Sequence, residues 1–152
     1  MRRVPNEPGM AAKVFTLLAE AGVNVDMIVQ ASASTGTADI SFTVPGSAAA
    51  KVRDVLQEKQ DELGYQSFDI DANVGKVAVV GVGMKTHSGL AAKFFNALSD
   101  EGVNVLMIST SEIRIAALVP LEQLQDAVRA LHTAYGLDAE QVEAVVYGGT
   151  GR

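Results

Sequence analysis

The residues best suited to hold a small ligand lie around two glycines, Gly9 and Gly89, which are predicted to open helices. The start of a helix presents unpaired backbone N–H groups and the positive end of the helix dipole, so it can hold a carboxylate. A glycine there lets a ligand approach the backbone closely. Asp26 could accept a charge-assisted hydrogen bond from a ligand ammonium group. Together, N–H donors and a carboxylate suit a zwitterion, which means a free amino acid.

Each of these residues also has a structural explanation, and both interpretations stay open. Gly9 follows Pro8 and could simply shape a turn. Asn24 and Asn104 are of a type found more often in turns than at ligands. Gln30 is a single polar residue in an apolar stretch, which is a weak indication of function.

No catalytic constellation is recognisable in the sequence. The chain has no cysteine, which excludes disulfides, thiolate metal sites and a cysteine nucleophile. His87 and His132 are far apart and lack clustered acids, which is a poor pattern for a metal site or a catalytic triad. The Gly81-Val82-Gly83 stretch lacks the third glycine of a dinucleotide-binding motif. We therefore expect no catalytic site, no cofactor and no metal in this chain.

Composition and charge limit the size of the core and the kinds of molecule that the chain is expected to bind. The chain has 152 residues, of which 48% are hydrophobic, so it can bury one ordinary core or two small ones. Its net charge of −6 argues against binding to nucleic acid or to an anionic membrane surface. No apolar run is long enough to span a bilayer, and no signal peptide precedes the first motif. We therefore expect a cytoplasmic protein.

The candidate residues belong to a sequence that the chain repeats. Residues 9–28 and 89–108 align without gaps at a shift of eighty positions, and twelve of the twenty positions are identical. One difference is that Leu106 stands where the first copy has Asp26. The chain is therefore predicted to consist of two copies of one unit, residues 1–74 and 75–152.

The same order of elements is predicted in each copy. Ala11, Val14, Phe15 and Leu18 have the i, i+3, i+4, i+7 spacing of an amphipathic helix, and residues 91–98 repeat it. Alternating apolar residues predict strands. The other predicted elements are a hairpin turning at 35–37, strands at 40–44, 68–74, 76–84, 104–110, 112–119 and 144–147, and helices over 47–63, 88–101 and 121–135. The order β-α-β-β-α-β predicts an α+β, ferredoxin-like unit whose helices cover one face of a four-stranded antiparallel sheet.

Several stretches carry a family resemblance, namely VPNEPGMAAKVF, VNVDMIVQ, GKVAVVGVGMKTHSGLAAKFF, VNVLMISTSEIRI, ALHTAYGL and VVYGGTGR. Together they resemble the C-terminal regulatory region of aspartokinase, and most nearly the actinobacterial type, in which a separate small regulatory subunit is made. The resemblance covers nearly the whole chain. It implies that each copy is an ACT domain, the amino-acid-sensing version of the ferredoxin-like fold.

The resemblance also implies a site and partners. Such subunits pair ACT domains side by side between chains, and the effector lies at the shared interface. The family senses threonine, lysine or both, and so controls phosphorylation of aspartate by a catalytic aspartokinase subunit; in isolation we expect a homodimer. Position by position, the implied effector-binding residues are Asn6, Gly9, Met10, Ala11, Asn24, Val25, Asp26, Gln30, Asn104, Val105, Ser111 and Glu112. For the last two, together with Thr110, an edge-strand ion pair with Arg114 is the favoured interpretation.

The sequence departs from the family in two places. The family commonly has an acid where this chain has Leu106, so we expect Asp26 to fix the ligand ammonium group and the second copy to be more structural. Fewer residues precede Val4 than in family members, so one edge of the first sheet is expected to stay open. An alternative function is a stand-alone scaffold in which both copies serve dimerisation and bind no effector.

Overall fold

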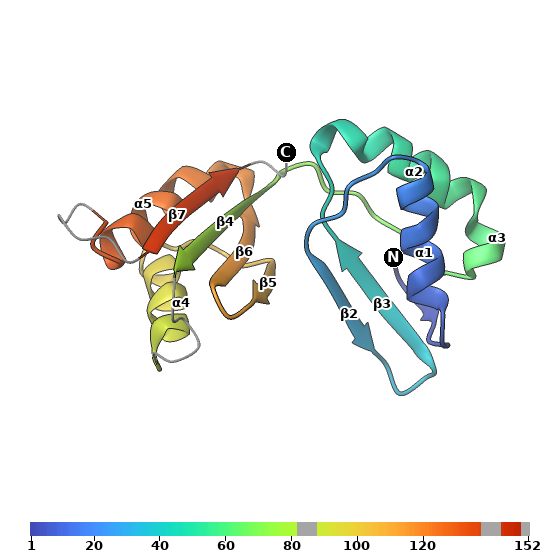
Figure 1. The fold of residues 1–152 in the computed structure, drawn as a ribbon, viewed down its shortest axis with the longest axis horizontal. Helices are drawn as coiled ribbons and strands as arrows, with labels where there is room; N and C mark the ends of the chain where they lie inside the picture. The colour runs from blue at the N-terminus through green and yellow to red at the C-terminus, as the bar shows by residue number, and fades with distance from the viewer. Residues whose placement is uncertain (82–87, 138–143, 150–152) are drawn as a thin grey trace. The chain divides into compact units, whose positions relative to one another are not determined.

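The computed structural model describes residues 1–81 and 88–137, and the backbone of one further strand at 144–149. The chain divides between Ala72 and Asn73 into two compact units (Figure 1). Val82 and Gly83 of the glycine-containing stretch, and His87, lie outside the described residues. Residues 138–143 and the end of the VVYGGTGR motif, 150–152, lie outside them as well. Among the described residues, no helix is both long and apolar enough to cross a membrane.

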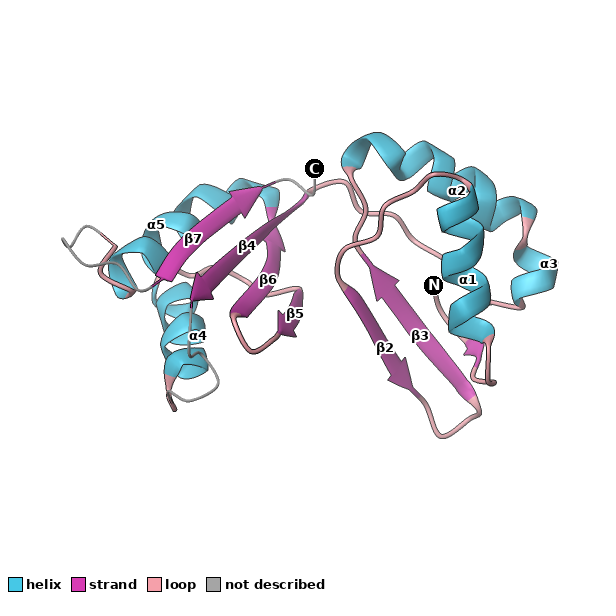
Figure 2. Ribbon diagram, in the orientation of Figure 1, coloured by secondary structure: helices cyan, strands magenta, loops and turns pink. Residues whose placement is uncertain are grey.

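The first unit is a three-stranded antiparallel sheet with helices on one face (Figure 2). The strand order is β1-β3-β2, so β3 is central and β2 is an edge strand. A 3₁₀ turn at Gly46–Ala48 leads into the second helix. The elements are β1 (Val4–Pro5), α1 (Met10–Glu20), β2 (Ile28–Ser32), β3 (Thr37–Phe42), α2 (Ala49–Glu58) and α3 (Gln60–Leu63).

The second unit has the four-stranded antiparallel sheet that the sequence predicts for a ferredoxin-like fold. The strand order is β5-β6-β4-β7, and β5 is an edge strand that corresponds to β2. A 3₁₀ turn at Leu121–Gln123 precedes its last helix. The elements are β4 (Val74–Gly81), α4 (Leu90–Asp100), β5 (Met107–Thr110), β6 (Arg114–Pro120), α5 (Leu124–Ala134) and β7 (Ala144–Gly149). The predicted α+β class and the β-α-β-β-α-β order of this copy are confirmed.

The strand predicted at 68–74 in the first copy is wrong. Its only ladder contact among the described residues is a bridge at Ser67, where the N–H of Arg2 donates to the Ser67 carbonyl at 2.8 Å. In this antiparallel register residue 68 stands opposite Met1, so β1 lies on the other side of the bridge and does not pair with residues 68–72. Phe68 and Ile70 still alternate with polar residues. The alternation places their side chains against the core beneath the helices, without strand pairing. Val74 instead begins β4.

A bulge interrupts the pairing of the N-terminal segment with β3. The Met1 ammonium group donates to the Ile40 carbonyl at 2.8 Å, and the Ile40 N–H donates back to the Met1 carbonyl at 2.9 Å. The next pair is Val4 with Ala38, so two residues between Met1 and Val4 stand opposite the single residue Asp39. One of them has a left-handed backbone, with φ of 51°, and its N–H donates to Asp39 Oδ1 at 2.9 Å. Because of this bulge, the chain pairs with β3 from Met1 onward, although β1 itself is only two residues long.

Each unit has its own hydrophobic core, built from one face of its helices. Val14 and Leu18 of α1 are fully buried, and Phe94 and Leu98 repeat them in α4, as the helical spacing predicts. The spacing also predicts that the first member of each set is buried. That prediction is wrong, because Ala11 and its counterpart in α4 are exposed. Those alanines lie in the first helical turn, which leaves the start of each helix open to solvent.

Candidate ligand-binding site

A cluster of three polar side chains lies at the end of the first sheet. Asn6 Nδ2 donates to Ser32 Oγ at 3.3 Å, and Gln30 Nε2 donates to Asn6 Oδ1 at 3.3 Å. The backbone N–H of Asn6 donates to the Gly36 carbonyl at 3.0 Å, which fixes the residue beside the hairpin. All three side chains are exposed, so a ligand could replace these hydrogen bonds without first having to unpack a core.

Sheet topology explains why these residues meet. β1 and β2 both pair antiparallel with β3, so they run parallel to each other on its two sides. Val4 and Ser32 are both partners of Ala38, which places the residues after β1 level with the end of β2. Asn6 therefore reaches across the end of β3 to Gln30, 24 positions further along the chain.

The start of α1 lies next to this cluster. Gly9 has a left-handed backbone with φ of 90°, and a Cβ built on it would meet no atom within 4 Å. The N–H of Lys13 donates to the Gly9 carbonyl at 2.9 Å, which closes the first helical turn. Within the described part of the chain, no side chain caps α1, so the N–H groups of Ala11 and Ala12 remain available to solvent or to a ligand. Gly9 therefore makes the turn and leaves open space above it, and its role in binding a ligand stays a prediction.

Asp26 does not lie beside the start of α1 within one unit, which corrects the expected pairing of helix and carboxylate. A helix between two parallel strands returns the chain to the far end of the sheet. The loop that contains Asp26 therefore leads into the beginning of β2, whereas the first turn of α1 lies at the end of β2 (Figure 1). The N–H of Asp26 donates to the Thr43 carbonyl at 3.0 Å. Ser32, at the other end, is six residues further on, or roughly 20 Å along an extended strand.

The remaining residues of the first copy have mixed roles. Met10 and Val25 are half-buried and pack against the core, so their side chains support the elements. Asn24 is exposed in the loop between α1 and β2, next to Asp26 and away from Gly9. The structure thus brings together Asn6, Gln30, Gly9 and the first turn of α1, and it separates them from the loop at 24–26.

In the second copy, the four predicted residues fall at opposite ends of β5. Asn104 and Val105 precede the strand, and the Asn104 N–H donates to Gln123 Oε1 at 2.9 Å. Ser111 and Glu112 follow the strand in the turn to β6, where the Ser111 N–H donates to the Arg114 carbonyl at 2.7 Å. These two pairs do not form one site within the unit.

Sequence reasoning missed two polar residues at these places. Ser32 could have been found, because it lies two positions after Gln30 and therefore on the same face of β2. Gln123 belongs to no motif, and only the structure shows that its side chain contacts the loop at 102–104.

The two edge strands, and the residues just before them, expose large apolar side chains. Ile28 of β2 is 50% exposed, and its counterpart Ile108 of β5 is 47% exposed. Leu106, at the position of Asp26, is 49% exposed, so the second copy has no core residue there. An edge strand with exposed apolar residues is a surface suited to pairing with another chain.

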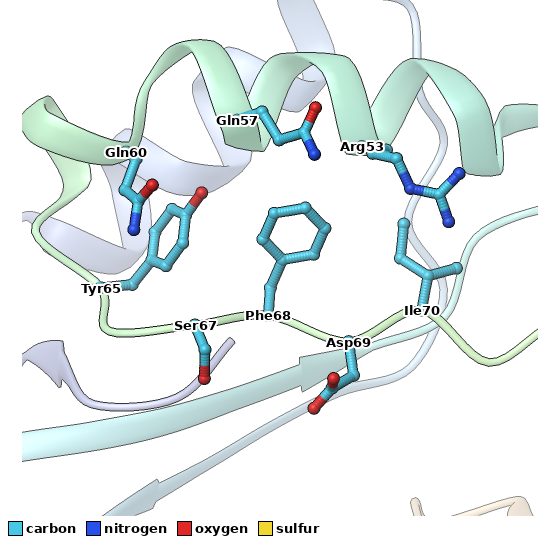
Figure 3. A pocket seen from close by; sticks show the side chains of 8 residues that line it. All are labelled: Arg53, Gln57, Gln60, Tyr65, Ser67, Phe68, Asp69 and Ile70. Atoms are coloured by element: carbon cyan, nitrogen blue, oxygen red, sulfur yellow. The ribbon is translucent and has the colours of Figure 1, made fainter.

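A separate hollow of about 430 Å³ lies between α2 and residues 65–70 of the first unit (Figure 3). Phe68 and Ile70 point toward the helix, while Ser67 and Asp69 point away from it. The Tyr65 hydroxyl donates to the Leu56 carbonyl, and burial raises the pKa of this tyrosine. None of the predicted site residues lines this hollow. Nor does the described part of the chain hold a cluster of three or more acids or histidines that could bind a metal.

Comparison with known proteins identifies the family. An ACT-domain model matches residues 2–60 and again residues 77–135. The aspartokinase of Corynebacterium glutamicum is 46% identical over 151 residues, which is 98% of this chain but 36% of that protein. The chain therefore spans about a third of the length of the curated relatives it matches.

Solved structures give the same result at matching length. A structure of aspartokinase alpha and beta subunits has a chain that is 44% identical, with a TM-score of 0.82 over 89% of this chain and 88% of that one. The ligand-free regulatory subunit of aspartate kinase from Thermus thermophilus is 38% identical, with a TM-score of 0.80 over 88% of this chain and 87% of that one. With two matched domains and regulatory subunits of nearly the same length, this chain belongs to the ACT-domain family, as a tandem pair of the aspartokinase regulatory type.

Proposed function

We propose that this chain is the regulatory part of an aspartokinase, which binds threonine and/or lysine at an interface between ACT domains. Binding inhibits phosphorylation of aspartate by a catalytic subunit, because the effector favours one arrangement of paired domains over another. The two ACT domains are residues 1–74 and 75–152. The relatives that carry this proposal are named as aspartokinases and as regulatory subunits of aspartate kinase.

The main support for this binding site is the polar cluster beside the uncapped start of α1. The N–H groups of Ala11 and Ala12 can hold the carboxylate of an amino acid, and Gly9 leaves room for it. Asn6 and Gln30 supply amide oxygens for an ammonium group and amide nitrogens for a hydroxyl group.

The second half of the site comes from another chain in this proposal. If the edge strand β2 of one chain pairs antiparallel with the edge strand β5 of a second, the start of β5 lies against the end of β2. Asn104 and Val105 then stand opposite Gln30 and the start of α1. The same pairing places Asp26 near the far end of the partner strand, with the Ser111–Glu112 turn. The exposed Ile28 and Ile108 become buried in the homodimer.

Titration calorimetry with threonine, with lysine and with both tests this function. Asn6→Ala is expected to weaken effector binding about tenfold, because it removes one hydrogen bond to a charged or polar ligand group. Asn96→Ala is the matched control, since Asn96 is exposed on α4, in the other copy, and should leave the affinity unchanged.

The stand-alone scaffold is the competing function, and the same samples distinguish it. A ligand bound by the folded state alone raises the melting temperature. A wild-type chain that dimerises, but whose melting temperature is unchanged by either amino acid at millimolar concentration, is a scaffold and not an effector sensor.

A further inference from the structure

The loop that follows the first helix has the same sequence in both copies but different hydrogen bonds. Both loops read Gly-Val-Asn-Val, at 22–25 and at 102–105. Both begin in the same way: the N–H groups of the glycine and the first valine donate to carbonyls in the last turn of the helix, each at 2.9 Å. Any difference in the next two residues must therefore come from the surroundings of the loop.

Gln123 makes that difference in the second copy. Its Oε1 accepts the N–H of Asn104 at 2.9 Å, and its Nε2 donates to the carbonyl of Gly102 at 3.2 Å. One side chain thus spans the loop and bonds to it at both ends. In the first copy, the described residues provide no such partner for the N–H of Asn24.

The reason lies in the 3₁₀ turns that precede α2 and α5. Each turn follows a proline, Pro45 or Pro120, and the third residue after the proline is Ala48 in the first copy and Gln123 in the second. An alanine methyl group can neither accept nor donate a hydrogen bond. Gln123 stands immediately before the buried Leu124, so its backbone is fixed by the core of the second unit.

A glutamine suits this position better than any other residue of its size. Its planar amide offers an acceptor and a donor together, which matches an N–H and a carbonyl two residues apart. Glutamate keeps the acceptor but places a negative charge against the Gly102 carbonyl. Methionine has a similar length and provides no strong hydrogen bond in either direction.

We propose that Gln123 is a positioning residue for the effector site, because it fixes the Asn104–Val105 segment in one conformation before the ligand arrives. The N–H groups of the neighbouring residues, at 102, 103, 104 and 106, all donate within the unit. Among the described residues, Val105 alone in this run has an N–H without a partner, and it is held ready for a ligand. This inference rests on the proposed function.

The second copy thereby supplies the preorganised half of the site, and the Asn24–Val25 segment of the first copy is left to adjust. A preordered segment loses less conformational freedom when a ligand binds, so affinity rises without any new contact. Gln123 itself touches no ligand in this arrangement.

The test compares Gln123→Met, Gln123→Glu and the matched control Gln125→Met, an exposed glutamine two positions further along. Amide hydrogen exchange by NMR measures the loop without ligand. In the wild type, the Asn104 amide is expected to exchange about fivefold more slowly than the Asn24 amide, and Gln123→Met should remove this protection. Calorimetry with threonine and with lysine should show affinity about fivefold lower for Gln123→Met, intermediate for Gln123→Glu and unchanged for Gln125→Met.

The outcomes separate this inference from the proposed function. If the wild type binds an amino acid and Gln123→Met binds it equally well, the positioning role is overturned and the proposed function stands. If the wild type binds neither amino acid, the proposed function and the role of Gln123 in affinity both fall. An affinity loss that accompanies a lower melting temperature, with exchange at Asn104 unchanged, would also overturn positioning, because it indicates general destabilisation.

Discussion

Gly9 combines a conformational requirement with an open surface, and the two can be separated by experiment. Its φ of 90° is one that residues with a Cβ rarely adopt, although no atom would touch that Cβ. Gly9→Ala is therefore expected to lower the free energy of unfolding by about 1 kcal/mol through backbone strain alone. Gly46 is the matched control, because a Cβ there also meets nothing and its φ is not positive.

Thermal denaturation followed by circular dichroism, without ligand, measures both variants. Gly46→Ala should be neutral or slightly stabilising, since alanine restricts the unfolded chain. Equal stability of Gly9→Ala and the wild type would show that the left-handed turn is not required, and would leave ligand access as the remaining explanation for this glycine.

Two tyrosines link the stability of each unit to alkaline pH. The hydroxyls of Tyr65 and Tyr135 donate to the carbonyls of Leu56 and Leu90, and burial raises the pKa of both above 10.0. Between pH 10 and these raised pKa values, the unfolded chain loses the phenolic proton first, so stability falls as pH rises. Tyr65→Phe should cost about 1 kcal/mol at pH 7 and reduce this alkaline loss, as measured by urea unfolding at pH 7 and pH 10.5.

If Tyr65→Phe is as stable as the wild type at pH 7, the hydrogen bond from the Tyr65 hydroxyl to the Leu56 carbonyl does not contribute to stability. Tyr135→Phe is the parallel variant in the second unit, and its effect should be confined to that unit's transition.

At the scale of elements, local patterns could be predicted and pairings could not. Val14 and Leu18 are two positions on one buried helical face, and that information lies within a few residues. The alternation at 68–72 is equally regular, but a strand also needs a partner, and the N-terminal segment supplies one only at Arg2, opposite Ser67. Periodicity therefore predicts which side chains are buried, and it does not show whether a neighbouring strand is present.

The candidate site shows the same division. The resemblance placed Asn6 and Gln30 in one site, and the parallel arrangement of β1 and β2 brings them within hydrogen-bonding distance. Asp26 was expected beside the helix start, yet the path of α1 carries the chain to the other end of the sheet first. Gln123 could not have been predicted, since its contact joins the 3₁₀ turn before α5 to a loop residue that lies 19 positions earlier.

For the whole molecule, the proposed site draws on a different feature of each copy. The first copy holds the polar cluster at the start of α1, and the second holds the Asn104 loop fixed by Gln123. A complete site in the proposed arrangement therefore needs a first copy and a second copy from different chains, which couples ligand binding to dimerisation.

The exposed apolar side chains of the edge strands test this coupling. Lysine at the edge of a sheet opposes pairing with another chain, so Ile28→Lys and Ile108→Lys should each shift the protein toward the monomer. Asn96→Lys is the control, because Asn96 is exposed but lies on α4, outside both edge strands and the turns that flank them. Sedimentation velocity over a concentration series measures the dimer dissociation constant, with and without threonine.

We expect each edge variant to weaken the dimer at least tenfold and to lower effector affinity in parallel, while Asn96→Lys changes neither. Added threonine should tighten the wild-type dimer, because a ligand that contacts both chains favours the associated state by the same free energy with which dimerisation favours binding. A monomeric wild type that binds threonine with full affinity would contradict a shared site. It would require Asn6, Gln30 and the start of α1 to hold the amino acid within one chain.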